Sequence, residues 1–432
     1  MKAQIEELGP IKKKISIEVE PADYQKELEK AYGKLQKEVQ IKGFRKGKVP
    51  REILEKYYKE RTESQVLTQL LEQSYVWALG EHKIMPVSQP KVSDLKTLGQ
   101  GLTYVAEVEV KPEIEAKNYK GIKLEKMSVE VSEEDIAKEL EALRSSHAQI
   151  SPAAEDAVIA QNHIAVIDFL GKIDGKAFAG GEGKGVSVEV GAGRFLEDFE
   201  KGLIGMKKGQ SKNIDVKFPK EYPSKDLAGK TAQFEMTLND VKEKILPELN
   251  DDFARDLGNF ESLAQVKEKL KEHMGHQKES GAKSDLSQQI LDHLIKENAF
   301  DVPDSMVEME LDSMLENAKR QLEQQRLTLE QAGITEEAFR AQNKEASLRR
   351  VKAFLLFDGI AKAENIQVTI EELRARIEQI AQSVGQSVET VEGHYRQNNM
   401  LHMLQAQISE EKILDFLIGQ SKIEELKPKK KK

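Results

Sequence analysis

The sequence predicts a multidomain protein of mixed class, with an N-terminal α+β domain, a β-rich middle domain and a mainly helical C-terminal domain. Its 432 residues exceed one ordinary domain, and this length favours about three. Glycines and short alternating runs gather in the middle of the chain, whereas the last part has the apolar spacing of helices. We place the domains at residues 1–112, 157–246 and 247–432, with a linker to the helical body at 113–156.

Composition excludes several classes of protein. Charged residues make up 33% of the chain and its formal net charge is −9, which excludes a protein that coats nucleic acid with a broad basic face. Without cysteine, disulfides, thiolate metal sites and a catalytic thiol are excluded too. There is no run of about 18 apolar residues, and the start lacks the apolar run of a signal peptide. We therefore expect a cytoplasmic protein that does not enter a membrane.

The N-terminal domain is predicted from two alternating segments and two helices. Residues 11–20 (IKKKISIEVE) and 102–110 (LTYVAEVEV) alternate as half-buried strands do, and we expect them to pair. Pro21 should end the first strand, before a helix over residues 24–40. Pro50 fits the start of a second helix over residues 51–82. The apolar positions expected of this helix include Ile53, Tyr57, Val66, Leu70, Leu71 and Trp77. Prolines at positions 86 and 90 then break the pattern.

The segment that joins these two helices concentrates positive charge in an acidic chain. It holds four cations, no acid and one phenylalanine between two glycines. Its residues are Lys42, Gly43, Phe44, Arg45, Lys46, Gly47 and Lys48. On the residues alone, the favoured interpretation is a solvated turn whose phenylalanine folds back on the helices. The alternative is a local docking site for a polyanion such as RNA.

The linker and the C-terminal domain carry helix signals. Ser132 precedes three acids and should cap a linker helix, and Thr369 with Glu372 forms a capping box. Asp304, Ser387 and Ser409 are further candidate N-caps, and a basic tail that we expect to be disordered begins at Leu426. The helical stripes are interrupted by Gln, Lys and Glu. Periodicity alone slightly favours a compact bundle over extended arms.

The middle domain resembles the FKBP-type prolyl isomerase family over about residues 162–243. The stretches IDFLGKIDGKAFAGG, VEVGAGRFLEDFEKGLIGMKKGQ and FPKEYP carry this resemblance. It implies a catalytic apolar pocket lined by Phe169, Phe178, Phe195, Leu196, Phe199, Tyr222, Leu227 and Phe234. Each phenylalanine alone is better explained as barrel core, but their joint spacing favours a pocket. Ala179 and Phe199 depart from the usual family residues, which implies weaker binding of macrolide inhibitors with isomerase activity retained.

Such a pocket suits this reaction physically. Rotation about an X–Pro bond is opposed by a barrier of about 18–20 kcal/mol, because amide resonance must be broken. A dry aromatic pocket favours the twisted bond, whose carbonyl is less polar than that of the planar amide. Neither a nucleophile nor a cofactor is required. The eight histidines are scattered without ligand spacing, so we expect no metal.

Taken together, the basic segment, the FKBP-like middle and the helical end resemble the trigger factor family of bacterial ribosome-associated chaperones. The sequence GFRK (43–46) matches the family's ribosome attachment signature without substitution. The resemblance implies docking on the large ribosomal subunit near the exit tunnel, through a ribosomal protein and rRNA, and arms that cradle nascent chains without ATP. It also implies a possible homodimer away from the ribosome, and roles in protein transport, the cell cycle and cell division.

Two other functions remain open at this point. The chain could be a dedicated prolyl isomerase whose flanking regions serve dimerisation or targeting. It could instead be an RNA-binding factor of ribosome assembly that uses the basic segment alone. Client holding without isomerase activity would distinguish the chaperone from the first alternative. Binding to naked RNA as tight as to ribosomes would favour the second.

Overall fold

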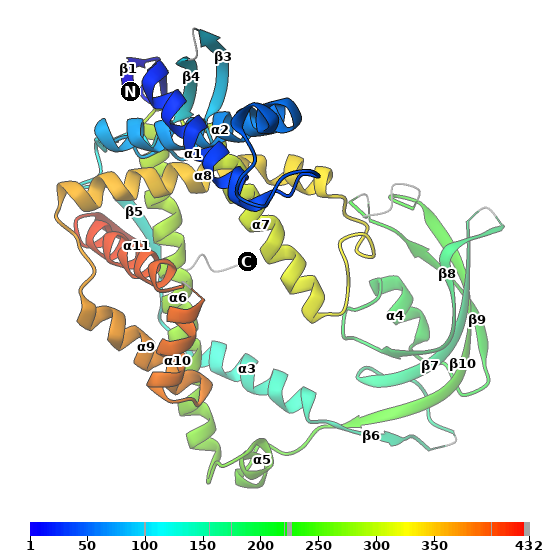
Figure 1. Ribbon diagram of the computed structural model, residues 1–432. Helices are drawn as coiled ribbons and strands as arrows, with labels where there is room; N and C mark the ends of the chain where they lie inside the picture. The colour runs from blue at the N-terminus through cyan, green and yellow to red at the C-terminus, as the bar shows by residue number, and fades with distance from the viewer. Residues whose placement is uncertain are drawn as a thin grey trace. The chain divides into compact units, whose positions relative to one another are not determined.

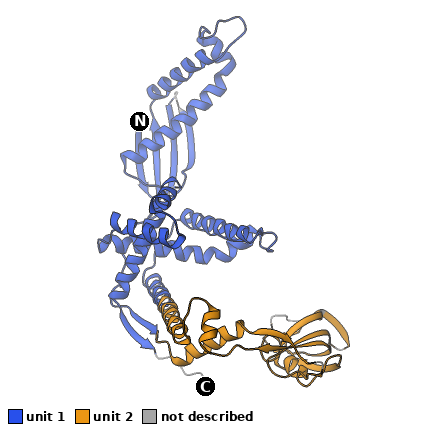
Figure 2. Ribbon diagram, turned by 90° about the horizontal axis from the view of Figure 1, so that it is seen from below, with its two compact units in different colours: residues 1–128, 283–432 blue, residues 129–282 orange. Residues whose placement is uncertain are grey.

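The computed structural model describes residues 1–98, 101–154, 156–173, 175–219, 221–222, 227–398 and 400–426, with only the backbone described at 98 and 179. The chain forms two compact units, which are coloured separately in Figure 2. Unit 1 combines residues 1–128 with residues 283–432, and unit 2 is formed by residues 129–282. Unit 1 is therefore built from the two ends of the chain.

The N-terminal part of unit 1 is a four-stranded antiparallel sheet with two helices. The strands are β1 (Lys2–Glu7), β2 (Lys12–Val19), β3 (Lys91–Leu98) and β4 (Gly101–Glu109), in the order β1-β2-β4-β3. The predicted pairing of β2 with β4 is confirmed, with Ile15 opposite Ala106. Alternate residues of β2 are buried beneath α1 (Pro21–Glu38) and α2 (Arg51–Glu81), which share one hydrophobic core with the sheet.

The predictions for this part were partly confirmed. The first strand ends before Pro21, as predicted, but α1 already begins at Pro21 and not at residue 24. Of the apolar positions predicted for α2, Val66 and Leu70 are buried, whereas Tyr57 and Trp77 are 65% and 37% exposed. The buried face of this helix also includes small and polar side chains; its buried residues are Leu54, Thr62, Val66, Leu70, Ser74 and Ala78. The strands β1 and β3 were not predicted.

The helical part of unit 1 has several small cores. The helices are α7 (Asp304–Gln324), α8 (Glu336–Ala363), α9 (Ile370–Val384), α10 (Val388–Gln397) and α11 (Leu401–Gly419), with the C-terminal end of α6 (Leu263–Glu297). One cluster joins the start of α7 to α8, a second joins α9, α10 and α11, and a third packs α6, α8 and α11 together. Apolar burial is thus divided among three separate clusters, as in arms, and the compact bundle is not observed.

Helix termini test the predicted caps. The capping boxes at Ser132 and at Thr369 with Glu372 are present, and the Ser387 hydroxyl caps α10. Asp304 does not cap α7, because Pro303 occupies the N-cap position and Asp304 is already helical. Ser409 lies inside α11. The predicted basic tail lies outside the described residues after 426, where β11 (Lys422–Leu426) ends as the parallel partner of β5 (Lys123–Met127).

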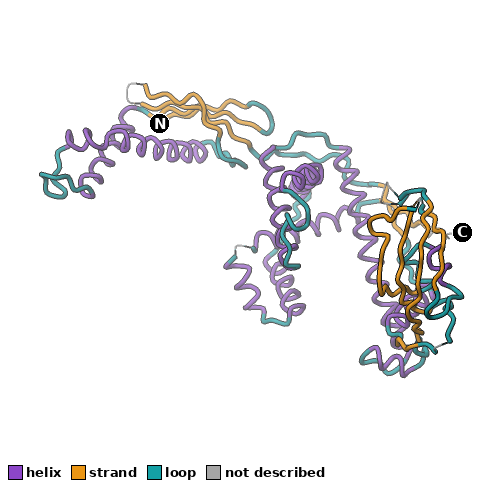
Figure 3. The backbone as a smooth tube through the Cα atoms, turned by 90° about the vertical axis from the view of Figure 1, so that its right-hand side faces the viewer, coloured by secondary structure: helices purple, strands orange, loops and turns teal. Residues whose placement is uncertain are grey.

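Unit 2 holds the β-rich middle of the chain. Its strands are β6 (Gln149–Pro152), β7 (His163–Ile173), β8 (Lys176–Glu189), β9 (Ser211–Lys217) and β10 (Thr231–Ile245). They form one sheet in the order β6-β10-β7-β8, and β9 pairs with the other end of β10. Figure 3 draws the strands of the protein in orange. The short α4 (Glu197–Leu203) packs on this sheet through the fully buried Leu203. The helices α3 (Glu133–Ser146) and α5 (Asp251–Leu257) complete the unit with the first part of α6.

Candidate functional sites

The basic segment forms a loop between α1 and α2 whose base is fixed. Val49 is fully buried in the N-terminal core, and the Gln36 side chain donates a 2.7 Å hydrogen bond to its carbonyl oxygen. Beside it, the Arg51 guanidinium lies 3.8 Å from the centre of the Tyr32 ring. These contacts hold the C-terminal end of the loop, while its tip extends beyond them (Figure 1).

Two consecutive turns shape the tip of the loop. The Phe44 amide donates to the Ile41 carbonyl and the Lys48 amide donates to the Arg45 carbonyl. Gly43 and Gly47 have φ angles of +97° and +78°, a region that side-chain-bearing residues rarely adopt, so the turns need glycine at both positions. Phe44 is 39% exposed. The loop is a solvated turn, as the residues alone favoured, but Phe44 is not among the side chains that pack against the N-terminal core.

The positive charges of the loop are also exposed. The side chains of Lys42, Arg45, Lys46 and Lys48 all lie at the surface. In the part of the chain that the structure describes, none of these four has a carboxylate within ion-pair distance. The loop therefore offers an aromatic ring surrounded by uncompensated cations.

In unit 2 the structure brings the predicted aromatic residues together. The Phe199 ring is central: it stacks on Phe195 at 5.2 Å and meets Phe169 and Phe234 edge to face at 5.5 Å and 5.3 Å. Phe178 contacts Phe234 from the other side at 6.0 Å. Phe199 and Phe234 are buried, whereas the other three are half-buried. The cluster thus has a buried centre, formed by Phe199 and Phe234, with half-buried rings around it.

The remaining predicted pocket residues line the edge of the same cluster. Leu196, Tyr222 and Leu227 are half-buried and pack against the core of unit 2. Phe218 joins them to the aromatic floor, because its ring lies 4.8 Å from Tyr222 and 6.3 Å from Phe178. It was missed in the sequence, although it begins the stretch FPKEYP.

A buried carboxylate, Glu200, supports the loop that carries Phe195 into this cluster. Glu200 is 5% exposed, and it accepts hydrogen bonds from the backbone amides of Gly191, Gly193 and Phe195 at 2.9–3.3 Å. Burial would raise the pKa of Glu200, but these amide donors outweigh it and hold the pKa below its ordinary value. The bonds fix the loop that places Phe195 on Phe199. Nothing in the sequence distinguishes this acid from its exposed neighbours.

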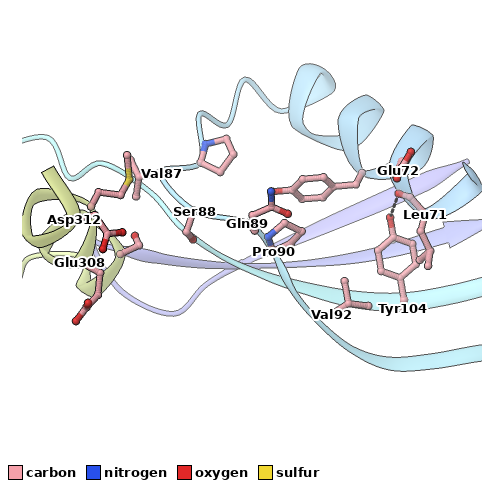
Figure 4. Close-up of a pocket in the computed structure, with 14 residues that line it drawn as sticks. Leu71, Glu72, Val87, Ser88, Gln89, Pro90, Val92, Tyr104, Glu308 and Asp312 are labelled. Atoms are coloured by element: carbon pink, nitrogen blue, oxygen red, sulfur yellow. Dashed lines mark hydrogen bonds between the residues drawn. The ribbon is translucent and has the colours of Figure 1, made fainter. Parts of the chain in front are cut away.

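A third feature is a groove of about 760 Å³ in unit 1, drawn in Figure 4. Its walls come from α2, from the segment that leads into β3 and from α7, through Leu71, Tyr75, Val87, Pro90, Val92 and Met309. Glu308 and Asp312 line its α7 side, where both pair with Arg340. Residues 71–104 and residues 305–312 form this groove together, and no sequence pattern predicted it.

Metal binding and membrane insertion are two further properties that a site could have. Within the described ranges, no three His, Asp or Glu side chains are grouped so that they could hold a metal ion. Among the helices that the structure describes, none has the length and apolar character needed to cross a membrane.

The chain is similar to known proteins along its whole length. Residues 1–143 match the family described as bacterial trigger factor protein, residues 262–419 match its C-terminal family, and residues 156–239 match the FKBP-type peptidyl-prolyl cis-trans isomerases. Trigger factor of Geobacter sulfurreducens is 40% identical over 98% of this chain and 99% of the relative. Trigger factor of Halothermothrix orenii is 37% identical over 97% of this chain and 99% of the relative. A solved trigger factor chaperone, 24% identical, shares the fold with a TM-score of 0.54 over 97% of this chain and 99% of that one.

Proposed function

The chain belongs to the trigger factor family, and we infer from this membership that it is an ATP-independent chaperone that binds nascent chains at the ribosome. It carries an FKBP-type peptidyl-prolyl isomerase domain. We further propose that it acts in the cytoplasm on the large ribosomal subunit near the exit tunnel, and that it dimerises when free. We propose that its domains span residues 1–112, 157–246 and 247–432, with a linker at 113–156. We also propose roles in protein transport and cell division.

The α1–α2 loop is the proposed ribosome-binding site, and the exposed Phe44 among unpaired cations is the observation that carries it. Lys42, Arg45, Lys46 and Lys48 would attract rRNA phosphates, an interaction that weakens with salt. Phe44 would add an anchor, because an aromatic ring that is buried in a partner contributes much of the binding energy of an interface. Gly43 and Gly47 would hold the required turns.

Ribosome co-sedimentation tests this site. We expect Phe44→Ala, and separately Arg45→Glu with Lys46→Glu, to lose co-sedimentation at physiological salt. Trp77→Ala is the matched control, because its ring is 37% exposed on the same domain, against 39% for Phe44. Binding by the loop variants equal to that of Trp77→Ala would refute docking through this loop.

The proposed isomerase site is the aromatic cluster of unit 2. A proline ring would lie on the floor formed by Phe199 and Phe234, between walls that include Phe169, Phe178 and Phe195. Leu196, Tyr222 and Leu227 would close its edge. Phe199→Ala and Phe234→Ala should each lower kcat/KM of prolyl isomerisation by at least about 10-fold, a loss of about 1.4 kcal/mol. Phe260→Ala, outside the cluster, is the control, and folded pocket variants with full activity would sink the assignment.

Client binding is proposed for apolar surface in unit 1. Met309 in the groove of Figure 4, Phe354 on α8 and Met403 on α11 are 62%, 50% and 61% exposed. Methionine adapts to many partners because its side chain is flexible and polarizable. Such scattered apolar sites favour weak, reversible holding of unfolded chains.

The full-length Phe199→Ala, Phe234→Ala double variant separates the chaperone from its alternatives. If it still prevents aggregation of a proline-poor client, holding does not depend on isomerisation. Loss of holding in this folded variant would favour a dedicated isomerase. Wild-type binding to protein-free rRNA as tight as to ribosomes would favour a ribosome-assembly factor.

A further inference from the structure

Helix α1 presents four exposed lysines on one face, namely Lys26, Lys30, Lys34 and Lys37. At 3.6 residues per turn and 1.5 Å per residue, they occupy a sector of about 80° and a length of about 16 Å. The opposite face of α1 is buried against the N-terminal core through Tyr24, Leu28 and Tyr32. We refer to the four lysines as the α1 lysine face.

The charge of this face is largely uncompensated. Lys30 pairs with Glu27 at 2.6 Å, but within the described ranges no carboxylate lies within 4.0 Å of Lys26, Lys34 or Lys37. Helical lysines elsewhere in the chain, such as Lys138 and Lys201, pair with an acid one turn away. In a chain with net charge −9, such a cluster of free cations is available to a partner.

Gly33 lies on the same face, three residues after Lys30 and four before Lys37. A glycine inside a helix destabilises it relative to alanine. A Cβ on Gly33 would meet nothing within 4 Å, so packing within the chain does not require glycine here. Because Gly33 has no side chain, the helix backbone between the lysines is exposed and the surface of a partner can approach it closely.

The α1 lysine face leads into the α1–α2 loop, since α1 ends at Glu38 and the loop begins with Lys42 nearby. Lysines one helical turn apart are about 5–6 Å from each other, which suits a polyanion with regularly spaced charges. The face has no large apolar side chain, whereas protein interfaces usually have aromatic anchors at their centre and stable membrane binding combines charge with an apolar insertion. These observations favour RNA over an acidic protein or an anionic membrane.

We propose that the α1 lysine face binds the phosphate backbone of RNA, independently of base sequence, beside the docking loop. This proposal rests on the proposed ribosome docking and extends it: Phe44 would select the position on the ribosome, and α1 would lie along an rRNA segment. Gly33 would allow the backbone of that segment to approach the helix.

Salt-dependent ribosome binding by full-length protein tests the proposal. The α1 variant combines four substitutions, Lys26→Gln, Lys30→Gln, Lys34→Gln and Lys37→Gln. Between about 0.05 and 0.2 M salt, we expect its slope of log affinity against log salt concentration to be smaller in magnitude than that of the wild type by about 3. The affinity at about 0.1 M salt should fall at least 10-fold. The control variant removes the same charge outside the N-terminal domain and should keep the wild-type slope. It combines Lys267→Gln, Lys271→Gln, Lys296→Gln and Lys344→Gln. An unchanged slope in the α1 variant would overturn the proposal.

A second variant tests the close approach without changing charge. Gly33→Leu should raise the melting temperature, because leucine favours helix, and yet weaken ribosome binding by about 10-fold. Gly393→Leu, at an open helical position of α10, should leave ribosome binding unchanged. Wild-type ribosome affinity in Gly33→Leu would contradict an approach at this position.

The nature of the partner is tested by photocross-linking from position 34 on ribosomes and by binding to a short RNA duplex. Cross-links to rRNA, and duplex binding that the α1 substitutions abolish, are expected. Cross-links to ribosomal protein alone would overturn RNA as the partner. So would α1 substitutions that abolish binding to phosphatidylglycerol vesicles but leave binding to the RNA duplex unchanged. If Phe44→Ala keeps full ribosome binding, the docking proposal itself fails. If Phe44→Ala loses it while the α1 variant does not, only the lysine face is refuted.

Discussion

Gly359 of α8 lies in backbone contact with Ile114, so that a Cβ at position 359 would overlap the Ile114 carbonyl oxygen. Next to this contact, Lys111 pairs with Asp358 at 3.0 Å and its ammonium lies 4.6 Å from the centre of the Phe354 ring. The extended segment that follows the N-terminal domain is thereby fastened to α8. This junction exists only because residue 359 has no side chain.

Gly359→Ala should therefore destabilise unit 1. Backbone atoms must move to admit the methyl group, which costs about 1–3 kcal/mol in a well-packed site. Urea denaturation followed by the fluorescence of Trp77 would measure the change. Gly393→Ala, where a Cβ meets nothing, should be neutral or stabilising by up to about 1 kcal/mol. A Gly359→Ala protein as stable as Gly393→Ala would contradict the packing described here.

Gly171→Ala should damage the isomerase site more than the fold. A Cβ on Gly171 would lie 2.6 Å from Cε1 of Phe234 and 2.8 Å from Cε1 of Phe178, so both rings must shift. We expect kcat/KM for a proline peptide to fall at least about 10-fold, because misplaced contacts weaken transition-state binding. Gly275→Ala, at an open position of α6, serves as the control. Unaltered isomerase activity would show that the rings adjust without consequence.

Glu200→Gln should weaken the wall of the pocket and change its pH dependence. Since folding lowers the pKa of Glu200, the carboxylate stabilises the fold fully above its ordinary value of 4.5, and this contribution is lost as pH falls through the lowered value. Glutamine accepts fewer hydrogen bonds, so we expect a loss of about 1–3 kcal/mol at neutral pH.

Hydrogen exchange at the amides of Gly191, Gly193 and Phe195 would measure this effect. After correction for intrinsic exchange, protection in the wild type should decline below pH 4.5, whereas protection in Glu200→Gln should be low throughout. Asp198→Asn, on the same helix but exposed, is the control. Identical protection in Glu200→Gln and wild type would exclude a supporting role for this carboxylate.

Val49→Ala should loosen the docking loop from its base. The Val49 side chain is fully buried, and its truncation leaves a cavity that costs about 1–2 kcal/mol. We expect ribosome affinity to fall by several-fold although no loop cation or Phe44 has changed. The control is Val66→Ala, which makes a similar cavity in the same core away from the loop. Equal ribosome binding by the two variants, at the level of the wild type, would refute the anchor.

Sequence patterns predicted the parts of the fold in which one face is buried. The strands β2 and β4 alternate because one face of the sheet is covered, whereas β3 is exposed along Lys91–Thr97 and shows no such alternation. The α2 core stripe was predicted only in part, through Val66 and Leu70, because it also uses Thr62, Ser74 and Ala78, which do not mark a hydrophobic face. Ser74 is accommodated there by a hydrogen bond to the Tyr104 hydroxyl.

The aromatic cluster was predicted through the resemblance of one long ordered stretch to the FKBP family, and the structure brings those residues together around Phe199. Local sequence could not reveal Glu200, since its partners are backbone amides that only the folded loop gathers. It could not reveal the groove either, whose walls come from segments more than 200 positions apart, such as Leu71 and Met309. The cap at Asp304 failed because Pro303 takes the N-cap position, which the residue type alone does not decide.

The parallel pairing of β5 with β11 bears on how this protein is made. β5 leaves the ribosome long before its partner Lys422–Leu426 is synthesised. Until then the edge of β5 has unpaired backbone groups and the helical core around it is incomplete, a state that favours aggregation. A newly made copy must therefore remain unfinished at least until residues 422–426 have left the ribosome. It faces the hazard from which its family protects other chains.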